Sequence, residues 1–217
     1  MIQLPNKKYD LLYVDPPWKY NNTISNGAAE NHYPSMTLPE MMQMPINSIT
    51  KPDCVMFMWH VPTHPMEALK LVEAWGFKFK SMKAFTWVKL NKRFQRVLKK
   101  KFCISNDEFD QLGELEVLQL LRSFSKMNGG NYTRANSEDV LVAVKGKGLE
   151  RLDAAVKQII FSPLGEPSEK PAQVRNEIEK LYGNDIDRLE MFSRRTLVGW
   201  DTFGNEVGKL DAIKEVA

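Results

Sequence analysis

Tyr9-Asp10-Leu11-Leu12-Tyr13-Val14-Asp15-Pro16-Pro17-Trp18 is the stretch from which the rest of the chain is interpreted. Leu11 to Val14 form a short apolar, β-favouring run, which predicts a buried strand. Pro16 and Pro17 lack amide hydrogens, so the strand must end before them. The strand end then offers a carboxylate, two carbonyls that no following amide can easily claim, and an indole ring. Because ligands bind at the carboxyl ends of strands in α/β sheets, these groups suit a planar ring with an amino group, such as an exposed nucleobase.

Length and composition indicate one α/β domain. The chain has 217 residues, of which 43% are hydrophobic and 26% charged, as in ordinary globular proteins. Its formal charge of +3 is too small to indicate nucleic-acid binding by itself. Cys54 and Cys103 define neither a disulfide framework nor a metal pattern, which predicts a reducing cytoplasm. His60 and His64 have the spacing of helical metal ligands, but Pro62 breaks that helix, so we expect no metal. We also expect no signal peptide and no membrane span.

Predicted strands and a capped helix follow the opening stretch. Residues 54–59 and 140–144 are apolar runs of strand length. Thr37 and Glu40 form a capping-box pattern, which predicts the start of a short helix. Between Trp18 and this helix, residues 19–30 are polar and contain an Asn-Gly turn signal. We interpret this segment as a loop over the site at the end of the first strand.

Two longer helices are predicted from proline and glycine positions. Pro65 favours a helix start and Gly76 a helix end. The predicted apolar face contains Met66, Leu69 and Val72, with Trp75 as a further candidate. Pro171 and Gly183 bracket a second helix in the same way. No G-x-G-x-x-G pattern is present, which argues against a nicotinamide enzyme.

The Asp-Pro-Pro-Trp motif at 15–18 resembles the signature of the DPPW-type adenine-N6 methyltransferases. This family includes the catalytic subunit of the eukaryotic messenger-RNA adenosine methyltransferase and DNA adenine methyltransferases of phages and bacteria. Further segments resemble the family in order: Trp75-Gly76-Phe77, Trp87-Val88-Lys89, residues 131–138, Ser168-Glu169-Lys170-Pro171, residues 188–194 and residues 199–206. The resemblance spans residues 9–206 apart from one insertion. It implies a single Rossmann-like methyltransferase domain over residues 1–217, with a permuted order in which the base-binding segment precedes the cofactor strand.

The resemblance also implies roles for individual residues, with S-adenosyl-L-methionine as cofactor. The catalytic residues would be Asp15, Pro16, Pro17 and Trp18. The cofactor would be held by Asp15, Lys170, Phe192, Arg194, Asn205 and Glu206. The target base would be contacted by Tyr33, Asn136 and Glu138.

Two departures from the family pattern alter what can be expected of the cofactor site. Family members usually have histidine where this chain has Glu169, which changes the charge of that loop. Relatives often carry an acidic residue upstream of the motif that contacts the cofactor adenine. Only fourteen residues precede Asp15 here, so this contact is missing or replaced.

From Leu90 to about Asn128 the composition shifts toward charge, and a leucine pattern with helical spacing predicts a helical insertion. Its basic residues include Lys92, Arg93, Arg96, Lys99 and Lys100. Such a segment beside a base-modifying site can hold phosphates. The alternative is a solvated helix face whose charges pair with the acidic residues that follow. The insertion is open to being a target-recognition module, a dimer interface or both, so a homodimer is an open alternative.

The predicted mechanism starts from the weak nucleophilicity of an adenine N6 amine, whose lone pair is delocalised into the ring. Asp15 and the Pro16 carbonyl would accept its two N–H bonds and aim the lone pair at the sulfonium methyl. Trp18 would stack on the base, and a duplex target would have to be flipped out. DNA is the predicted substrate, in the cytoplasm of a bacterium or a phage-infected host. Methylation of RNA adenosine or of cytosine N4, and an inactive nucleic-acid-binding scaffold, are the alternatives. The intact Asp15 argues against the scaffold.

Overall fold

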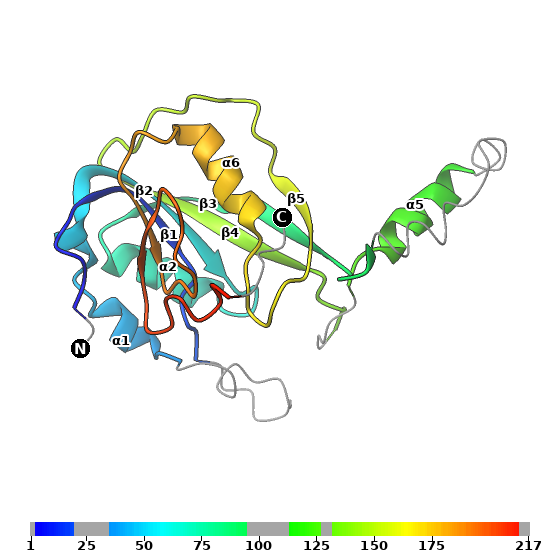
Figure 1. Ribbon diagram of the computed structural model, residues 1–217, viewed down its shortest axis with the longest axis horizontal. Helices are drawn as coiled ribbons and strands as arrows, with labels where there is room; N and C mark the ends of the chain where they lie inside the picture. Colours follow the sequence, from blue (N-terminus) through cyan, green and yellow to red (C-terminus); the bar gives the residue numbers. More distant parts are fainter. Residues whose placement is uncertain (1–2, 20–34, 95–112, 127–131, 213–217) are drawn as a thin grey trace.

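A seven-stranded sheet forms the centre of the computed structural model, which describes residues 3–19, 35–94, 113–126 and 132–212 (Figure 1). The strand order is β5-β3-β4-β2-β1-β6-β7. β4 runs antiparallel to both of its neighbours, whereas all other pairs are parallel. This mixed, mostly parallel sheet confirms the predicted α/β fold of the Rossmann-like methyltransferase type. The strands are β1 (Tyr9–Val14), β2 (Thr50–His60), β3 (Lys78–Leu90), β4 (Ser137–Lys145), β5 (Ile159–Pro163), β6 (Arg188–Met191) and β7 (Asp201–Phe203).

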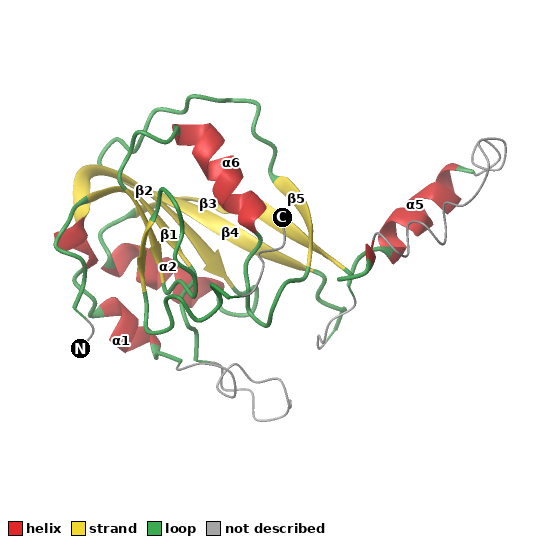
Figure 2. Ribbon diagram, in the orientation of Figure 1, coloured by secondary structure: helices red, strands yellow, loops and turns green. Residues whose placement is uncertain are grey.

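Helices cover both faces of the sheet, as Figure 2 shows. One face carries α1 (Leu38–Met42), the 3-10 helix η2 (Ile46–Ile49) and α2 (Pro65–Ala74), whose apolar side chains share one core cluster. The opposite face carries α6 (Ala172–Tyr182), which packs in a second cluster. A fifth helix, α5 (Glu114–Ser123), projects away from this body (Figure 1).

The strand β1 is buried on both faces, which explains its continuous apolar run. Leu12 and Val14 lie in the core beneath α1 and α2, while Leu11 and Tyr13 lie in the core beneath α6. β1 pairs in parallel with β2 on one side and β6 on the other. Asp15 therefore stands at the carboxyl edge of the sheet, at the centre of the fold.

Local sequence signals predicted the helix starts correctly, but the predicted buried face of α2 was only partly right. The capping box of α1 is formed: the Glu40 amide donates to Thr37 Oγ1 (3.4 Å) and the Thr37 amide donates to the Glu40 carboxylate (2.7 Å). In α2, Met66 is 60% exposed rather than buried. The inward stripe contains the predicted Val72 and Trp75 together with Ala68 and Leu71, and these four follow the i, i+3, i+4, i+7 spacing of one helix face.

The helix α5 lies inside the predicted insertion and confirms its helical character. Leu115, Leu118 and Leu121 lie on this helix and are exposed. At its base, Ser125 forms an isolated bridge with Leu90 at the end of β3. The carboxyl end of α5 therefore lies next to the carboxyl edge of the sheet, where Asp15 lies.

Candidate functional site

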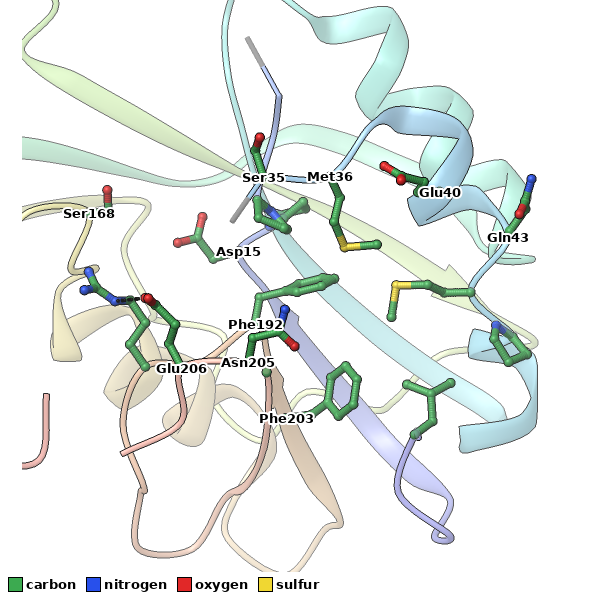
Figure 3. A pocket seen from close by; sticks show the side chains of 17 residues that line it. Asp15, Ser35, Met36, Glu40, Gln43, Ser168, Phe192, Phe203, Asn205 and Glu206 are labelled. Atoms are coloured by element: carbon green, nitrogen blue, oxygen red, sulfur yellow. Dashed lines mark ion pairs between the residues drawn. The ribbon is translucent and has the colours of Figure 1, made fainter. Parts of the chain in front are cut away.

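A cavity of about 470 Å³ opens at the carboxyl ends of β1 and β6 (Figure 3). One end of the cavity is apolar and is lined by Leu4, Met36, Met44, Pro45, Phe192 and Phe203. The other end is polar and is lined by Asp15, Ser168, Arg194, Asn205 and Glu206. Five of the six residues predicted to hold the cofactor thus share one cavity, and Lys170 contacts Asp15 beside it. The volume and the mixed lining suit a small molecule with an apolar ring at one end and charged groups at the other.

An unusual backbone conformation turns Phe192 into this cavity. Phe192 follows β6 directly and has a φ of 62°, which is costly for a bulky side chain. Gly204 allows this arrangement, because a Cβ there would lie 2.9 Å from the Ser193 carbonyl oxygen and 3.0 Å from the Phe192 Cα. The ring of Phe192 meets Phe203 edge to face, with 6.4 Å between ring centroids. The strained turn and the glycine together create the aromatic wall of the cavity.

The polar end contains charged atoms that still have hydrogen-bonding capacity. Arg194 Nε lies 2.9 Å from Glu206 Oε2, but the contact is an ion pair without hydrogen-bond geometry. Both atoms are buried and have no hydrogen-bond partner among the described residues. Arg194 Nη1 donates to the Pro167 carbonyl at 2.7 Å, which fixes the guanidinium. Buried polar atoms of this kind are ordinarily satisfied, so this end of the cavity suits a polar ligand.

Asp15 is also the first member of a network of four charges on the side of the sheet edge that faces α6. Asp15 lies 3.1 Å from Lys170 Nζ, which lies 3.4 Å from Glu138 Oε2. The other oxygen of Glu138 accepts from Lys89 Nζ. Each ammonium group also stands 5.3 Å from the centre of an indole ring, Lys170 over Trp59 and Lys89 over Trp87. Two carboxylates and two ammonium groups make the network neutral overall.

The environment shifts the two carboxylates in opposite directions. Burial raises the pKa of Asp15 above its ordinary value, although Lys170 partly opposes the shift. The Asp15 side chain is 32% exposed, but that exposed part lines the cavity, so protein surrounds the rest. Burial alone would also raise the pKa of Glu138, but Lys170 and Lys89 outweigh it and hold that pKa below the ordinary value. Asp15 is therefore the stronger base of the two.

Two details of the motif differ from the prediction. The Pro16 carbonyl is not unclaimed, because it accepts from the Trp18 amide at 2.8 Å, and the Pro17 carbonyl accepts from the Met36 amide at 2.8 Å. Each carbonyl keeps a second lone pair. The Trp18 side chain is only 8% exposed and packs in the core beneath α1 and α2 instead of lining the cavity. Its ring is therefore not placed to stack on a base next to Asp15.

The remaining predicted substrate residues lie partly outside the described residues. Tyr33, Arg96, Lys99 and Lys100 fall outside them. Asn136 is exposed, and its side-chain amide donates to Ser125 Oγ at 3.2 Å. Its backbone carbonyl accepts from the Lys89 amide at 2.8 Å. Lys92 pairs with Glu166 at 3.3 Å, and Arg93 is exposed. Lys92 thus pairs with an acid, but one from a segment far along the chain rather than from the insertion.

Sequence reasoning missed several residues of the site, among them Gln43, Leu4, Met36 and Met44. Lys89 was assigned to a family landmark and to the basic run, and not to the site, although its spacing from Trp87 places both on one face of β3. Since Trp87 pairs with Glu138 across the sheet, Lys89 becomes the diagonal neighbour of Glu138. Leu4, Met36 and Met44 carry no signal that separates a cavity wall from ordinary core.

The described residues contain no candidate metal site and no candidate membrane-spanning helix. No three His, Cys, Asp or Glu side chains in this part of the chain group together as metal ligands would. None of its helices has the length and apolar character that crossing a membrane requires.

The chain is similar to one protein family and to two methyltransferases. Residues 9–112 and 100–206 match the family model described as MT-A70. The type II methyltransferase M.MunI of Mycoplasma sp is 31% identical over 224 residues, an alignment that covers 94% of this chain and 80% of that protein. The human N(6)-adenine-specific methyltransferase METTL4 is 24% identical over 215 residues, which cover 95% of this chain but only 39% of METTL4.

Proposed function

The chain belongs to the MT-A70 family of methyltransferases, and from this premise we propose that it transfers a methyl group from S-adenosyl-L-methionine to the N6 amine of adenine in DNA. The observation that carries the proposal is the position of Asp15. This residue lines a cavity of cofactor size and is also one of the four charges of a neutral network. The similarity to a type II methyltransferase favours DNA, and the similarity to an N6-adenine-specific enzyme favours this amine.

The cavity fits the proposed cofactor, which carries an apolar adenine ring, a ribose and a charged amino-acid group. We place the adenine at the apolar end against Phe192, where Met36 and Met44 line the same space. Arg194, Asn205 and Glu206 would hold the ribose hydroxyls and the charged group, since all three line the polar end of the cavity. Bound there, S-adenosylmethionine supplies an electrophilic methyl group on a sulfonium.

Glu40, in α1, and Gln43, directly after α1, offer polar groups that could contact the adenine of the cofactor. Glu40 and Gln43 line the cavity at its apolar end (Figure 3). The Glu40 carboxylate is already used by the Thr37 cap, at 2.7 Å from the Thr37 amide. Gln43 offers a carboxamide with both a donor and an acceptor, which matches the N6 amine and ring nitrogens of adenine. We therefore assign the cofactor-adenine contact to Gln43.

The role of Lys170 also changes in this proposal. The family pattern assigns it to the methionine carboxylate, but here Lys170 contacts Asp15 and Glu138. We propose that it chiefly holds the Asp15 carboxylate in place and compensates its charge. Glu138, Asn136 and Tyr33 would face the target base.

The chemistry then needs a lone pair, a proton acceptor and exclusion of water. Asp15 and the second lone pair of the Pro16 carbonyl accept the two N6–H bonds, which directs the N6 lone pair toward the methyl group. As the new C–N bond forms, the electrons of the C–S bond stay on sulfur and N6 becomes positively charged. The N6 proton passes to Asp15, whose raised pKa makes it a better acceptor than an ordinary carboxylate.

The test is transfer of labelled methyl from S-adenosylmethionine to unmethylated duplex DNA, with single-stranded RNA in parallel, followed by mass analysis of the nucleosides. N6-methyldeoxyadenosine from the duplex is the expected product. Label only in RNA would overturn the substrate, and N4-methylcytosine would overturn the target amine. Cofactor binding without transfer to any of them would support an inactive scaffold. DNA as substrate also implies the cytoplasm of a bacterium or a phage-infected host as the compartment.

A further inference from the structure

Glu169 and Arg195 form an ion pair inside the protein, directly behind the polar end of the cavity. Arg195 Nε donates to Glu169 Oε1 at 2.9 Å, and Arg195 Nη2 contacts the same oxygen. Only 7% of the Glu169 side chain and 10% of the Arg195 side chain are exposed. Neither residue lines the cavity, but their sequence neighbours Ser168 and Arg194 do. The charge of Glu169 is therefore compensated inside the protein and is not presented to a ligand.

Each partner also holds a second segment of backbone. Glu169 Oε2 accepts from the Glu166 amide at 2.8 Å and closes the tight loop that begins at Gly165. A Cβ at Gly165 would lie 2.3 Å from that oxygen, so a side chain there would displace the Glu169 carboxylate. Arg195 Nη1 donates to the Leu210 carbonyl at 2.7 Å. Both oxygens of the carboxylate and two edges of the guanidinium are thus used.

The pair consequently joins three segments that are far apart in the sequence. Residues 165–170 carry Lys170, residues 192–196 carry Arg194, and residues 203–210 carry Glu206. The last two segments are joined once more by the Leu210 amide, which donates to the Arg194 carbonyl at 3.0 Å. These are the segments from which the polar end of the cavity is built.

We propose that Glu169 and Arg195 are positioning residues for the cofactor, which act by holding Lys170, Arg194 and Glu206 in register. This inference rests on the proposed function, because it assumes that the cavity binds S-adenosylmethionine. It also accounts for glutamate at a position where the family pattern has histidine: the carboxylate serves the arginine that follows Arg194. A purely structural ion pair is the competing explanation, and it predicts that stability changes while cofactor affinity does not.

The experiment compares Glu169→Gln, Arg195→Met, the double variant and a matched control. The control is Glu179→Gln, because Glu179 pairs with the buried Arg188 at 3.0 Å and neither residue lines the cavity. Affinity for S-adenosylhomocysteine is measured by calorimetry at a temperature where all variants are folded, and the melting temperature is measured separately. We expect both single variants to melt earlier and to bind at least about tenfold more weakly.

The double variant separates positioning from stability. Its melting temperature should recover relative to both single variants, because no buried charge is left without its partner. Its affinity should stay about tenfold weaker than that of wild type, because the Glu169–Arg195 contact, which helps to join the three segments, is lost. The control should melt earlier yet bind within about twofold of wild type. Affinity that recovers with the melting temperature, or wild-type affinity in Glu169→Gln, would overturn the inference while leaving the proposed function intact. Wild-type protein that binds no cofactor would overturn both.

Discussion

Replacing Asp15 with asparagine keeps the size of the side chain and removes the charge that the proposed chemistry uses. In the wild-type network two carboxylates face two ammonium groups, with Asp15 at 3.1 Å from Lys170. The variant leaves this network with one excess positive charge, next to a nitrogen that becomes positive during transfer. Loss of one preorganised electrostatic partner typically reduces kcat by about 10²–10³-fold, or about 2.7–4 kcal/mol. We expect a loss of at least this size for Asp15→Asn.

The assay for this variant is single-turnover transfer of labelled methyl to duplex DNA, combined with calorimetry of S-adenosylhomocysteine binding. Binding should stay within about threefold of wild type, because aromatic and polar groups other than Asp15 line most of the cavity. The control is Asp53→Asn, which removes an exposed carboxylate at the opposite end of the sheet, where it accepts from the Lys147 amide at 2.6 Å. A transfer rate for Asp15→Asn within tenfold of wild type would refute the role given to this carboxylate.

Three further predictions follow from the same geometry. Because burial raises the pKa of Asp15 and only its ionised form can take up the N6 proton, kcat should fall about tenfold per pH unit on an acidic limb that lies above the ordinary carboxylate pKa of 3.8. A flat profile down to about pH 4 would contradict this. Gly204→Ala should weaken cofactor binding about tenfold or more in calorimetry, because the added Cβ meets backbone atoms at 2.9–3.0 Å. The control Gly113→Ala should not weaken binding, because its Cβ would lie 3.7 Å from the Glu116 carboxylate. Tyr13→Phe leaves Trp59 Nε1 without the hydroxyl that it contacts at 2.7 Å, so chemical denaturation should show a loss of about 1–3 kcal/mol, and an unchanged midpoint would contradict this.

Features that depend on a few neighbouring residues were predictable from the sequence. The β1 strand and its end follow from an apolar run with prolines behind it, and the α1 start follows from the Thr37 and Glu40 pattern. The same holds for α6, where Pro171 precedes the helix and Gly183 ends it with a φ of 76°. In each case the atoms that decide the conformation belong to one short segment, so no knowledge of the fold is required.

Features that depend on packing between distant segments were not predictable. The sequence suggested that the Trp18 ring is exposed beside Asp15, where it could stack on a base. In the fold, the core beneath α1 and α2 buries this ring. Met66 and Ala68 are both plausible on an inward helix face, and only the packing of α2 on the sheet selects Ala68. The Pro16 carbonyl was expected to have no hydrogen bond, because the next residue, Pro17, has no amide hydrogen. The amide of Trp18, one residue further on, donates to it instead. Hydrophobic periodicity contains no information about such tertiary choices.

The direction of β4 explains how the charges of the site come together. Asp15 and Lys89 stand at the carboxyl ends of β1 and β3, whereas Glu138 stands at the beginning of β4. A residue at the start of a parallel strand would lie at the opposite edge of the sheet. Because β4 alone runs antiparallel, its first residues meet the ends of its neighbours, and Glu138 reaches the same edge as Asp15.

The charges of two lysines allow the two acids to stand close together. A carboxylate enclosed beside Asp15 would by itself raise the pKa of Asp15 further and favour its protonated form, which cannot take up the N6 proton. Lys170 lies between the two acids, and Lys89 compensates Glu138 from its other side. The site can therefore hold a second acid close to the target amine without neutralising the first. A parallel β4 would place Glu138 at the opposite edge of the sheet from Asp15. Removing either lysine would leave the two acids with an excess negative charge. The direction of β4 and the charges of the two lysines are therefore parts of the same catalytic arrangement.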